Sequence, residues 1–150
     1  MADKVWAGAK LWIGGSGVTP TWVEVGEVIG FTGDLGATWK TADASVLADV
    51  YDRTAKTTRD PGKLDVTYRV GSNAGQTAVA AANDDAVNSY HFKVSLADDA
   101  PSAGDNPTTF VFKALVLSAN KVKGANRNGL IEATASLDIQ GAVTYTAAAA

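Results

Sequence analysis

Apolar and polar residues alternate with a period of two along several segments of this 150-residue chain. Because successive side chains of a strand point to opposite faces, this alternation predicts strands with one buried and one solvated face. The period is clearest in three segments, whose apolar faces consist of Leu64, Val66, Tyr68 and Val70; of Tyr90, Phe92, Val94 and Leu96; and of Ile131, Ala133, Ala135, Leu137 and Ile139. The chain is therefore expected to be mainly antiparallel β structure.

Two further segments carry apolar residues on both faces. The second faces carry Val111, Leu115 and Leu117, interrupted only by Lys113, in residues 109–118, and Trp6 and Trp12 beside Lys10 in residues 5–13. Such a strand is either central in its sheet or covered on its other face, by a second sheet of the same subunit or by a partner. The apolar stretch 22–31 follows a glycine-rich turn and is expected to form a hairpin with the first strand.

One helix is expected at about Ala74 to Asn88. Asn73 can cap its first turn, and Gln76 follows at capping-box spacing. One helix among several strands gives the fold class α+β, mainly β: an antiparallel β-sandwich or small barrel flanked by one α-helix. The length fits a single domain spanning residues 1–150.

Residues 32–62 lack a continuous apolar period and are expected to be one long loop. Acidic and basic side chains are nearly balanced in it, and a short apolar cluster surrounds Val50. Compact domains rarely contain a loop of this length unless the loop has a function. We therefore expect an assembly loop at about residues 32–62.

The composition excludes most catalytic chemistry. The chain has no cysteine and one histidine, so it has no thiolate nucleophile, disulfide or multi-histidine metal site. A net charge of −3 argues against a phosphate-binding surface based on gross positive charge. Gly14, Gly15 and Gly17 complete no nucleotide-binding motif and are expected to form a turn. The sequence therefore predicts no enzymatic activity and no cofactor or metal.

Two other features favour structural roles over chemistry. His91 falls on the polar face of a predicted strand, so we expect an ordinary surface histidine. Asp98, Asp99 and Asp105 lack the ligand spacing of an EF-hand and are expected in a solvated turn.

No apolar run is long enough to span a membrane, and the N-terminus lacks the pattern of a secretory signal, so synthesis in the cytoplasm is expected.

The order of these segments resembles the tail tube, or major tail, proteins of long-tailed bacteriophages over nearly the whole chain. The segments that carry the resemblance are the early strand at 10–13 followed by 22–28, the long loop with 48–54 and 59–62, the strand at 63–68, the helix after Ser72, the strand at 90–94, and the closing hairpin with 116–118, 128–131 and 135–141. The resemblance lies in order and spacing, since no single segment is a signature.

The resemblance implies a structural virion protein that assembles into stacked hexameric rings, the tail tube through which DNA leaves the capsid. It implies no catalytic site, and location in the phage tail after synthesis in the host cytoplasm. The implied partners are copies of the same chain, tail tip and tail terminator proteins, a tape-measure protein and DNA in transit, without membrane insertion. Type VI secretion tubes and phage-derived injection devices share this fold, so a tube protein of such a device is the alternative.

Candidate residues follow from combining this resemblance with the surplus apolar surface. The expected ring interface consists of Trp6, Trp12, Val111, Leu115 and Leu117. The expected ring-stacking residues are Val46, Leu47, Val50, Tyr51, Arg53 and Arg59. Glu132 and Asp138, on the polar face of the last strand, are candidates for the lumen, because a tube that passes DNA is expected to have a neutral or acidic wall.

Two other classes of function remain open from the sequence. A monomeric β-sandwich binding module would use Trp22, Trp39 and Tyr51 as an aromatic platform. A small carboxylate-dependent hydrolase would use a pair among Asp49, Asp52 and Asp60, although no base or oxyanion partner is evident.

Overall fold

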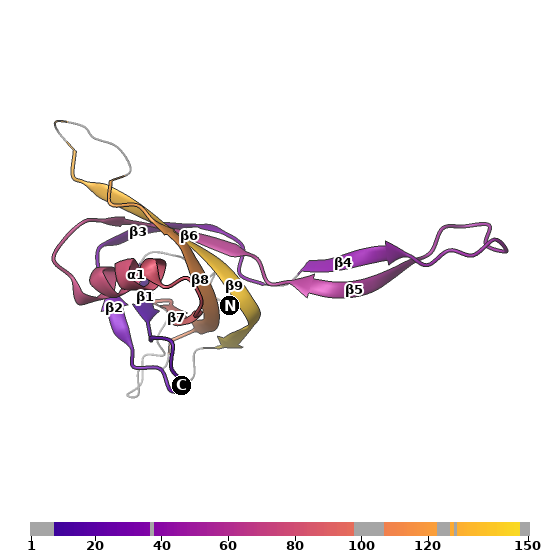
Figure 1. Cartoon of the computed structure of the whole chain (residues 1–150), viewed down its shortest axis with the longest axis horizontal. Helices are drawn as coiled ribbons and strands as arrows, with labels where there is room; N and C mark the ends of the chain where they lie inside the picture. The colour runs from indigo at the N-terminus through magenta and orange to yellow at the C-terminus, as the bar shows by residue number, and fades with distance from the viewer. Residues whose placement is uncertain (1–7, 37, 98–106, 123–126, 128, 148–150) are drawn as a thin grey trace.

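Nine strands and one helix make up the part of the chain described by the computed structural model, which covers residues 8–36, 38–97, 107–122, 127 and 129–147. Their bounds are β1 Lys10–Ile13, β2 Val23–Val25, β3 Val28–Gly33, β4 Thr38–Asp43, β5 Thr54–Asp60, β6 Lys63–Arg69, α1 Ala74–Asp84, β7 Tyr90–Ser95, β8 Thr109–Ala119 and β9 Glu132–Thr146. Seven strands form one antiparallel sheet in the order β2-β1-β7-β8-β9-β6-β3, and β4 and β5 form a separate pair (Figure 1). The predicted class, mainly β with one helix, is confirmed.

The seven-stranded sheet curls into a half-barrel around a single core. α1 packs against β8, β2 and β1 and covers one side of that core. The largest fully buried side chains are Leu11, Val25, Leu64, Val66, Val79, Phe92, Val94, Thr108 and Leu137. The predicted apolar faces of β6, β7 and β9 therefore point inward, as expected from their alternation. Val70 and Ile131 are exceptions, because they lie just outside β6 and β9 and are about half exposed.

The segment at 109–118, which is apolar on both faces, forms most of β8. It lies between β7 and β9, with Phe92 opposite Phe112 and Leu137 opposite Val116. Phe112 and Val116 are buried in the core, whereas Leu117 on the other face is about half exposed. We call the face of the sheet that points away from the core the outer face. No second sheet of the described chain buries the outer face of β8, so the two-sheet sandwich is wrong for this strand.

The stretch 22–31 divides between the two edges of the sheet. β2 pairs with β1, with Val25 opposite Leu11, as expected for the predicted hairpin. β3 pairs instead with β6, where Phe31 lies opposite Val66, so the expectation of one continuous hairpin partner was wrong. The chain crosses between the edges through Gly26 and Glu27 alone, and Glu27 adopts a φ of 61° at this corner. The half-barrel therefore curls enough to bring its edge strands close together.

α1 begins where the sequence predicted and ends earlier. The Asn73 side chain accepts hydrogen bonds from the amides of Gly75 and Gln76, at 2.8 and 3.3 Å. The helix ends at Asp84 and not at Asn88, because the Asp85 carboxylate accepts hydrogen bonds from the amides of Val87 and Asn88, each at 3.0 Å. A side chain that bonds the following amides in this way competes with helical hydrogen bonds.

Within the expected loop at 32–62, residues 38–60 form a β-hairpin, and Thr32 and Gly33 still belong to β3. β4 and β5 pair from Asp43 and Thr54 down to Thr38 and Asp60, with a bulge after Trp39. Every residue of both strands is exposed, and the pair projects from the half-barrel (Figure 1). Because neither face is buried, the hairpin has no apolar alternation for sequence analysis to detect.

Candidate assembly site

The hairpin ends in an exposed apolar tip, which we define as residues 44–53. Relative exposures are 107% for Leu47, 90% for Val50 and 85% for Tyr51, and Val46 is also exposed. Large apolar side chains exposed together at the end of an arm are typical of an interaction surface. The structure thus places five of the six predicted stacking residues in the tip: these four apolar residues and Arg53.

Polar contacts hold the tip in shape without covering its apolar side chains. Asp49 Oδ2 accepts hydrogen bonds from the amide of Val46 and from Nε of Arg53, both at 2.8 Å. The amide of Arg53 donates to Ser45 Oγ at 2.7 Å, and the Ser45 amide donates to Asp43 Oδ1 at 2.9 Å. The Ser45 amide also lowers the pKa of the Asp43 carboxyl from its usual value. Arg53 is therefore part of the frame of the tip.

Arg59, the last predicted stacking residue, lies at the other end of the hairpin. It is opposite Trp39 in the β4–β5 register, and its guanidinium lies 5.1 Å from the Trp39 ring centroid. The Lys56 ammonium is 5.5 Å from the same centroid. Both cations are therefore within cation–π distance of the Trp39 ring.

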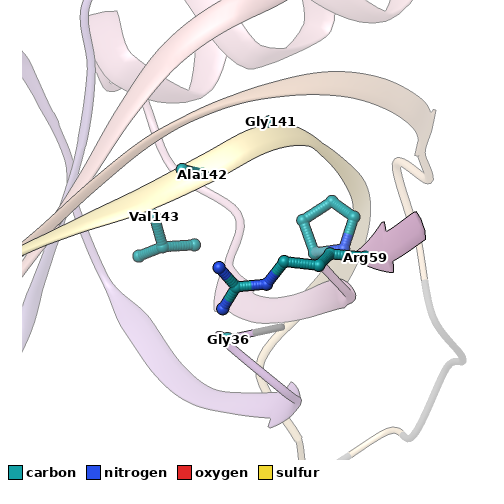
Figure 2. Close-up of a pocket in the computed structure, with 6 residues that line it drawn as sticks. Gly36, Arg59, Gly141, Ala142 and Val143 are labelled. Carbon is teal, nitrogen blue, oxygen red and sulfur yellow. The ribbon is translucent and has the colours of Figure 1, made fainter. Parts of the chain in front are cut away.

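A hollow of about 360 Å³ opens beside Arg59, and we call it the base hollow. Its walls are Gly36, Arg59, Pro61, Gly141, Ala142 and Val143. Figure 2 shows the Arg59 guanidinium pointing between Gly36 and the bend of β9 that carries Val143. Gly141 has a φ of 90°, and the bend at this residue lets β9 continue to Thr146 past the base of the hairpin. Sequence analysis missed this hollow, and a glycine inside a strand was its only signal.

Trp12 lies on the outer face, where it contacts its own subunit. Its ring centroid is 5.0 Å from Lys93 Nζ, and its Nε1 donates a hydrogen bond to Ser95 Oγ at 3.2 Å. Lys93 Nζ also lies 4.8 Å from the Trp22 centroid, and partial burial between the rings lowers the pKa of this lysine. Trp12 is consequently half-buried in the subunit, and Trp6 lies outside the described residues.

The other predicted ring-interface residues share this outer face. The register places Lys93 between Trp12 and Val111, so these three side chains form one row across β1, β7 and β8. Leu115 and Leu117 continue along β8, where Leu115 is half-buried and Leu117 exposed. The outer face therefore has an apolar band along β8, interrupted by the exposed Lys113, that ends in the Trp12 cluster.

Both lumen candidates lie opposite basic residues. In the β6–β9 register, Glu132 is opposite Arg69 and Asp138 is opposite Lys63. Opposite charges directly across two antiparallel strands attract one another. This part of the outer face is thus close to charge-balanced, which agrees with a neutral wall better than with an acidic one.

The residues named for a binding platform are not brought together. Trp22 packs edge-on against His91, with ring centroids 6.4 Å apart, on the body of the protein. Trp39 lies at the base of the hairpin and Tyr51 at its tip. His91 Nε2 lies 2.8 Å from the Gly17 carbonyl oxygen, so this histidine contacts the glycine turn, which the sequence did not predict.

Of the carboxylates named for a hydrolase, Asp60 is separated from the other two. Asp49 and Asp52 lie in the tip, where Asp49 is bonded to Val46 and Arg53, whereas Asp60 Oδ1 accepts a hydrogen bond from the Gly62 amide at the base. Among the described residues no group of three or more His, Cys, Asp or Glu side chains could hold a metal ion, and Asp98, Asp99 and Asp105 lie outside them. No helix in the described ranges is long and apolar enough to cross a membrane.

Comparisons with known proteins identify the fold. No protein-family model matches the chain, and no curated protein matches its sequence. A chain in the cryo-EM structure of the anti-feeding prophage baseplate, symmetrised six-fold, matches with a TM-score of 0.66 and 14% identity over 98% of both chains. A chain in the PVC sheath/tube terminator, from an extracellular contractile injection system, matches with a TM-score of 0.70 and 12% identity over 98% and 99%.

A third solved structure extends the likeness to another kind of machine. The structure of a type six secretion system protein matches with a TM-score of 0.51 and 14% identity, over 91% of this chain and 82% of that chain. Identities this low establish shared fold alone. Over nearly its whole length, the chain therefore has a tube-like fold that occurs in contractile injection assemblies.

Proposed function

We propose that this chain is a structural subunit of the tube of a contractile injection assembly, in which rings of the protein stack through the β4–β5 hairpin. The observation that carries the proposal is the exposed hairpin with its apolar tip. A lone two-stranded hairpin is marginally stable in water, so a projecting one that also exposes large apolar side chains is suited to dock on a neighbour. The fold shared with chains of contractile injection assemblies is the reason for proposing this class of assembly.

Burial of the tip supplies a driving force for stacking. Val46, Leu47, Val50 and Tyr51 are all exposed in the isolated chain. Full burial of a large apolar side chain is worth about 1.5–3 kcal/mol, so the tip contributes several kcal/mol before the costs of association. Because every subunit of a ring presents the same tip, the stacking contact is multiplied around the ring.

The matched structures favour an injection device over the tail tube of a long-tailed phage. These structures are of an anti-feeding prophage, an extracellular contractile injection system and a type six secretion system protein. We extend to this chain the six-fold ring of the symmetrised baseplate, with proteins of the baseplate and of the tube terminator as further partners. A tube that conducts DNA from a phage capsid, with its tape-measure protein, is the narrower version of the same proposal.

The outer face has the features expected of a ring interface and a tube wall. Trp12, Val111, Leu115 and Leu117 supply the apolar band for a head-to-tail contact between neighbours in a ring. Glu132 and Asp138, balanced by Arg69 and Lys63, supply a near-neutral patch past which cargo slides. The protein itself is then the main partner of each copy.

The test is negative-stain electron microscopy, with light scattering for mass, on the full chain and on a variant without the tip. In the variant, an Asn-Gly turn replaces residues 44–53 and keeps β4 and β5 joined. We expect hollow tubes from the full chain, and rings or single subunits with unchanged circular dichroism from the variant. Normal tubes from the variant contradict stacking through the tip, and failure of the full chain to form rings or tubes at any concentration contradicts the proposed function.

A further inference from the structure

We propose that the base hollow is the receptor for the hairpin tip of a second copy of this chain, with Asp52 of the incoming tip pairing with Arg59. The inference rests on the proposed function and deepens it by naming both halves of the stacking contact. It assigns to Arg59 a role different from that of the other predicted stacking residues. They belong to the inserted part, whereas Arg59 belongs to the part that receives it.

The chemistry of the two ends is complementary. The tip combines exposed apolar side chains with two acids, of which Asp49 is already paired with Arg53. Asp52 is exposed and makes no hydrogen bond or ion pair with any residue of the described chain. The base hollow combines apolar walls with the guanidinium of Arg59, which likewise has no carboxylate partner in the described ranges. An unpaired acid beside apolar groups thus matches an unpaired cation beside apolar groups.

The size of the hollow also suits this occupant. About 360 Å³ lies at the lower end of the range of small-molecule pockets, which is room for a few side chains and not for a whole element. Its walls include two glycines and an alanine, and a Cβ added at Gly36 or Gly141 would meet no other atom within 4 Å. The entrance is therefore open to side chains such as Leu47 and Tyr51.

The position of the two ends explains why this contact builds a stack. The tip joins β4 to β5, whereas Arg59 of the base hollow lies near the other end of the hairpin, so a tip cannot fill the hollow of its own chain. Figure 1 shows this hairpin projecting from the half-barrel. A contact between two different surfaces is head-to-tail, and it continues indefinitely when its geometry does not close on itself. β5 has seven residues, which span about 23 Å at 3.3 Å per residue, so the hollows of successive copies lie roughly this far apart.

A charge exchange tests the pairing directly. Asp52→Arg gives a copy whose tip and hollow are both basic, and Arg59→Asp gives a copy in which both are acidic. We expect each variant alone to lose at least tenfold in tube mass by light scattering. We expect an equimolar mixture to regain tubes, because each tip then meets a hollow of opposite charge. Lys56→Asp is the matched control, since Lys56 contacts the same Trp39 ring but does not line the hollow, and it should still form tubes.

A disulfide trap gives a second readout that does not need tubes. The chain has no cysteine, so Tyr51→Cys combined with Val143→Cys should give a ladder of cross-linked species longer than dimers under oxidation. The control Tyr51→Cys with Val18→Cys places the second thiol on the exposed glycine turn and should give no ladder. If the full chain forms tubes but the mixture does not recover and no ladder forms, the receptor is wrong and the proposed function stands. If neither tubes nor a ladder form, both the receptor role of the base hollow and the proposed function are wrong.

Discussion

Gln76 is the side chain that fixes the corner between the two edges of the half-barrel. Its Nε2 donates hydrogen bonds to the carbonyl oxygens of Gly26 and Arg69, at 3.0 and 2.8 Å, and its Oε1 accepts one from the Gly71 amide at 3.0 Å. The sequence correctly placed this glutamine in the first turn of the helix but assigned it to a capping box. That assignment is wrong, because the backbone it bonds belongs to the sheet corner and to the end of β6.

We predict that Gln76→Leu lowers the free energy of unfolding by about 2 kcal/mol. The leucine keeps the volume but leaves two carbonyl oxygens and one amide without this partner. A fully buried unsatisfied group costs about 1–3 kcal/mol, and these groups cost less because Arg69 and Gly71 are exposed to water. Urea unfolding followed by circular dichroism measures the loss. Gln140→Leu is the control, since exposed Gln140 bonds only Asp138, and it should change stability by less than about 0.5 kcal/mol. Equal effects of the two substitutions would contradict the role of Gln76.

Asp85 makes the stability of the turn after α1 depend on pH. Four hydrogen bonds, from the amides of Val87 and Asn88, the Asn88 side chain and the Tyr90 hydroxyl, lower the pKa of the Asp85 carboxyl far below its usual value. A pKa that is lower in the folded state stabilises the protein above the unfolded pKa, and this stability is lost as the pH falls toward the folded pKa.

We therefore predict that Asp85→Ala is less stable than the wild type at pH 7, and that the difference narrows as the pH falls below about 4, the usual pKa of aspartate. Urea unfolding at pH 7, 4 and 2.5 checks this trend. Asp84→Ala, at the preceding residue on the last turn of α1, is the control and should show no comparable dependence. If the difference in free energy of unfolding between Asp85→Ala and the wild type stays constant down to pH 2.5, the carboxylate charge is not the cause of that difference.

At the scale of elements, alternation predicted the strands that have one buried face. β6, β7 and most of β9 lie where the period of two predicted them, because alternate residues of these strands are buried and therefore apolar. β4 and β5 were missed for the opposite reason, since both faces are exposed and no apolar pattern marks them. The base hollow could not be predicted, because it exists only where the bend at Gly141 meets Arg59.

The exposed hairpin should be the least protected element of the free subunit. β8 lies within the sheet and contributes buried residues to the core, whereas β4 and β5 are held by each other alone. We predict that amides of β4 and β5 exchange with deuterium at least a hundredfold faster than those of β8 in the free subunit, and that assembly slows them strongly. Hydrogen exchange with mass spectrometry measures both states. Exchange in β4 and β5 that is unchanged by assembly would contradict docking of the hairpin.

At the scale of the whole molecule, the proposed function needs two directions of growth, and the chain has two candidate surfaces for them. The tip and the base hollow lie at the ends of the projecting hairpin, whereas the apolar band of the outer face lies on the half-barrel itself. A head-to-tail contact that closes gives a ring, and one that does not close gives a stack. We therefore assign ring formation to the outer face and stacking to the hairpin, which makes the two steps separable by substitution.

Leu117 offers the cleanest test of the ring contact, because its side chain is 53% exposed and leaves the core untouched when changed. We predict that Leu117→Asp abolishes rings while the melting temperature of the free subunit changes by less than about 2 °C. Trp12→Glu is a weaker test of the contact between subunits, since it also removes the indole side chain that contacts Lys93. Val122→Asp is the matched control: Val122 is 54% exposed but lies beyond the end of β8, and its variant should form rings. Rings from Leu117→Asp as abundant as those from Val122→Asp would move the ring contact away from β8, while leaving the hairpin as the stacking device.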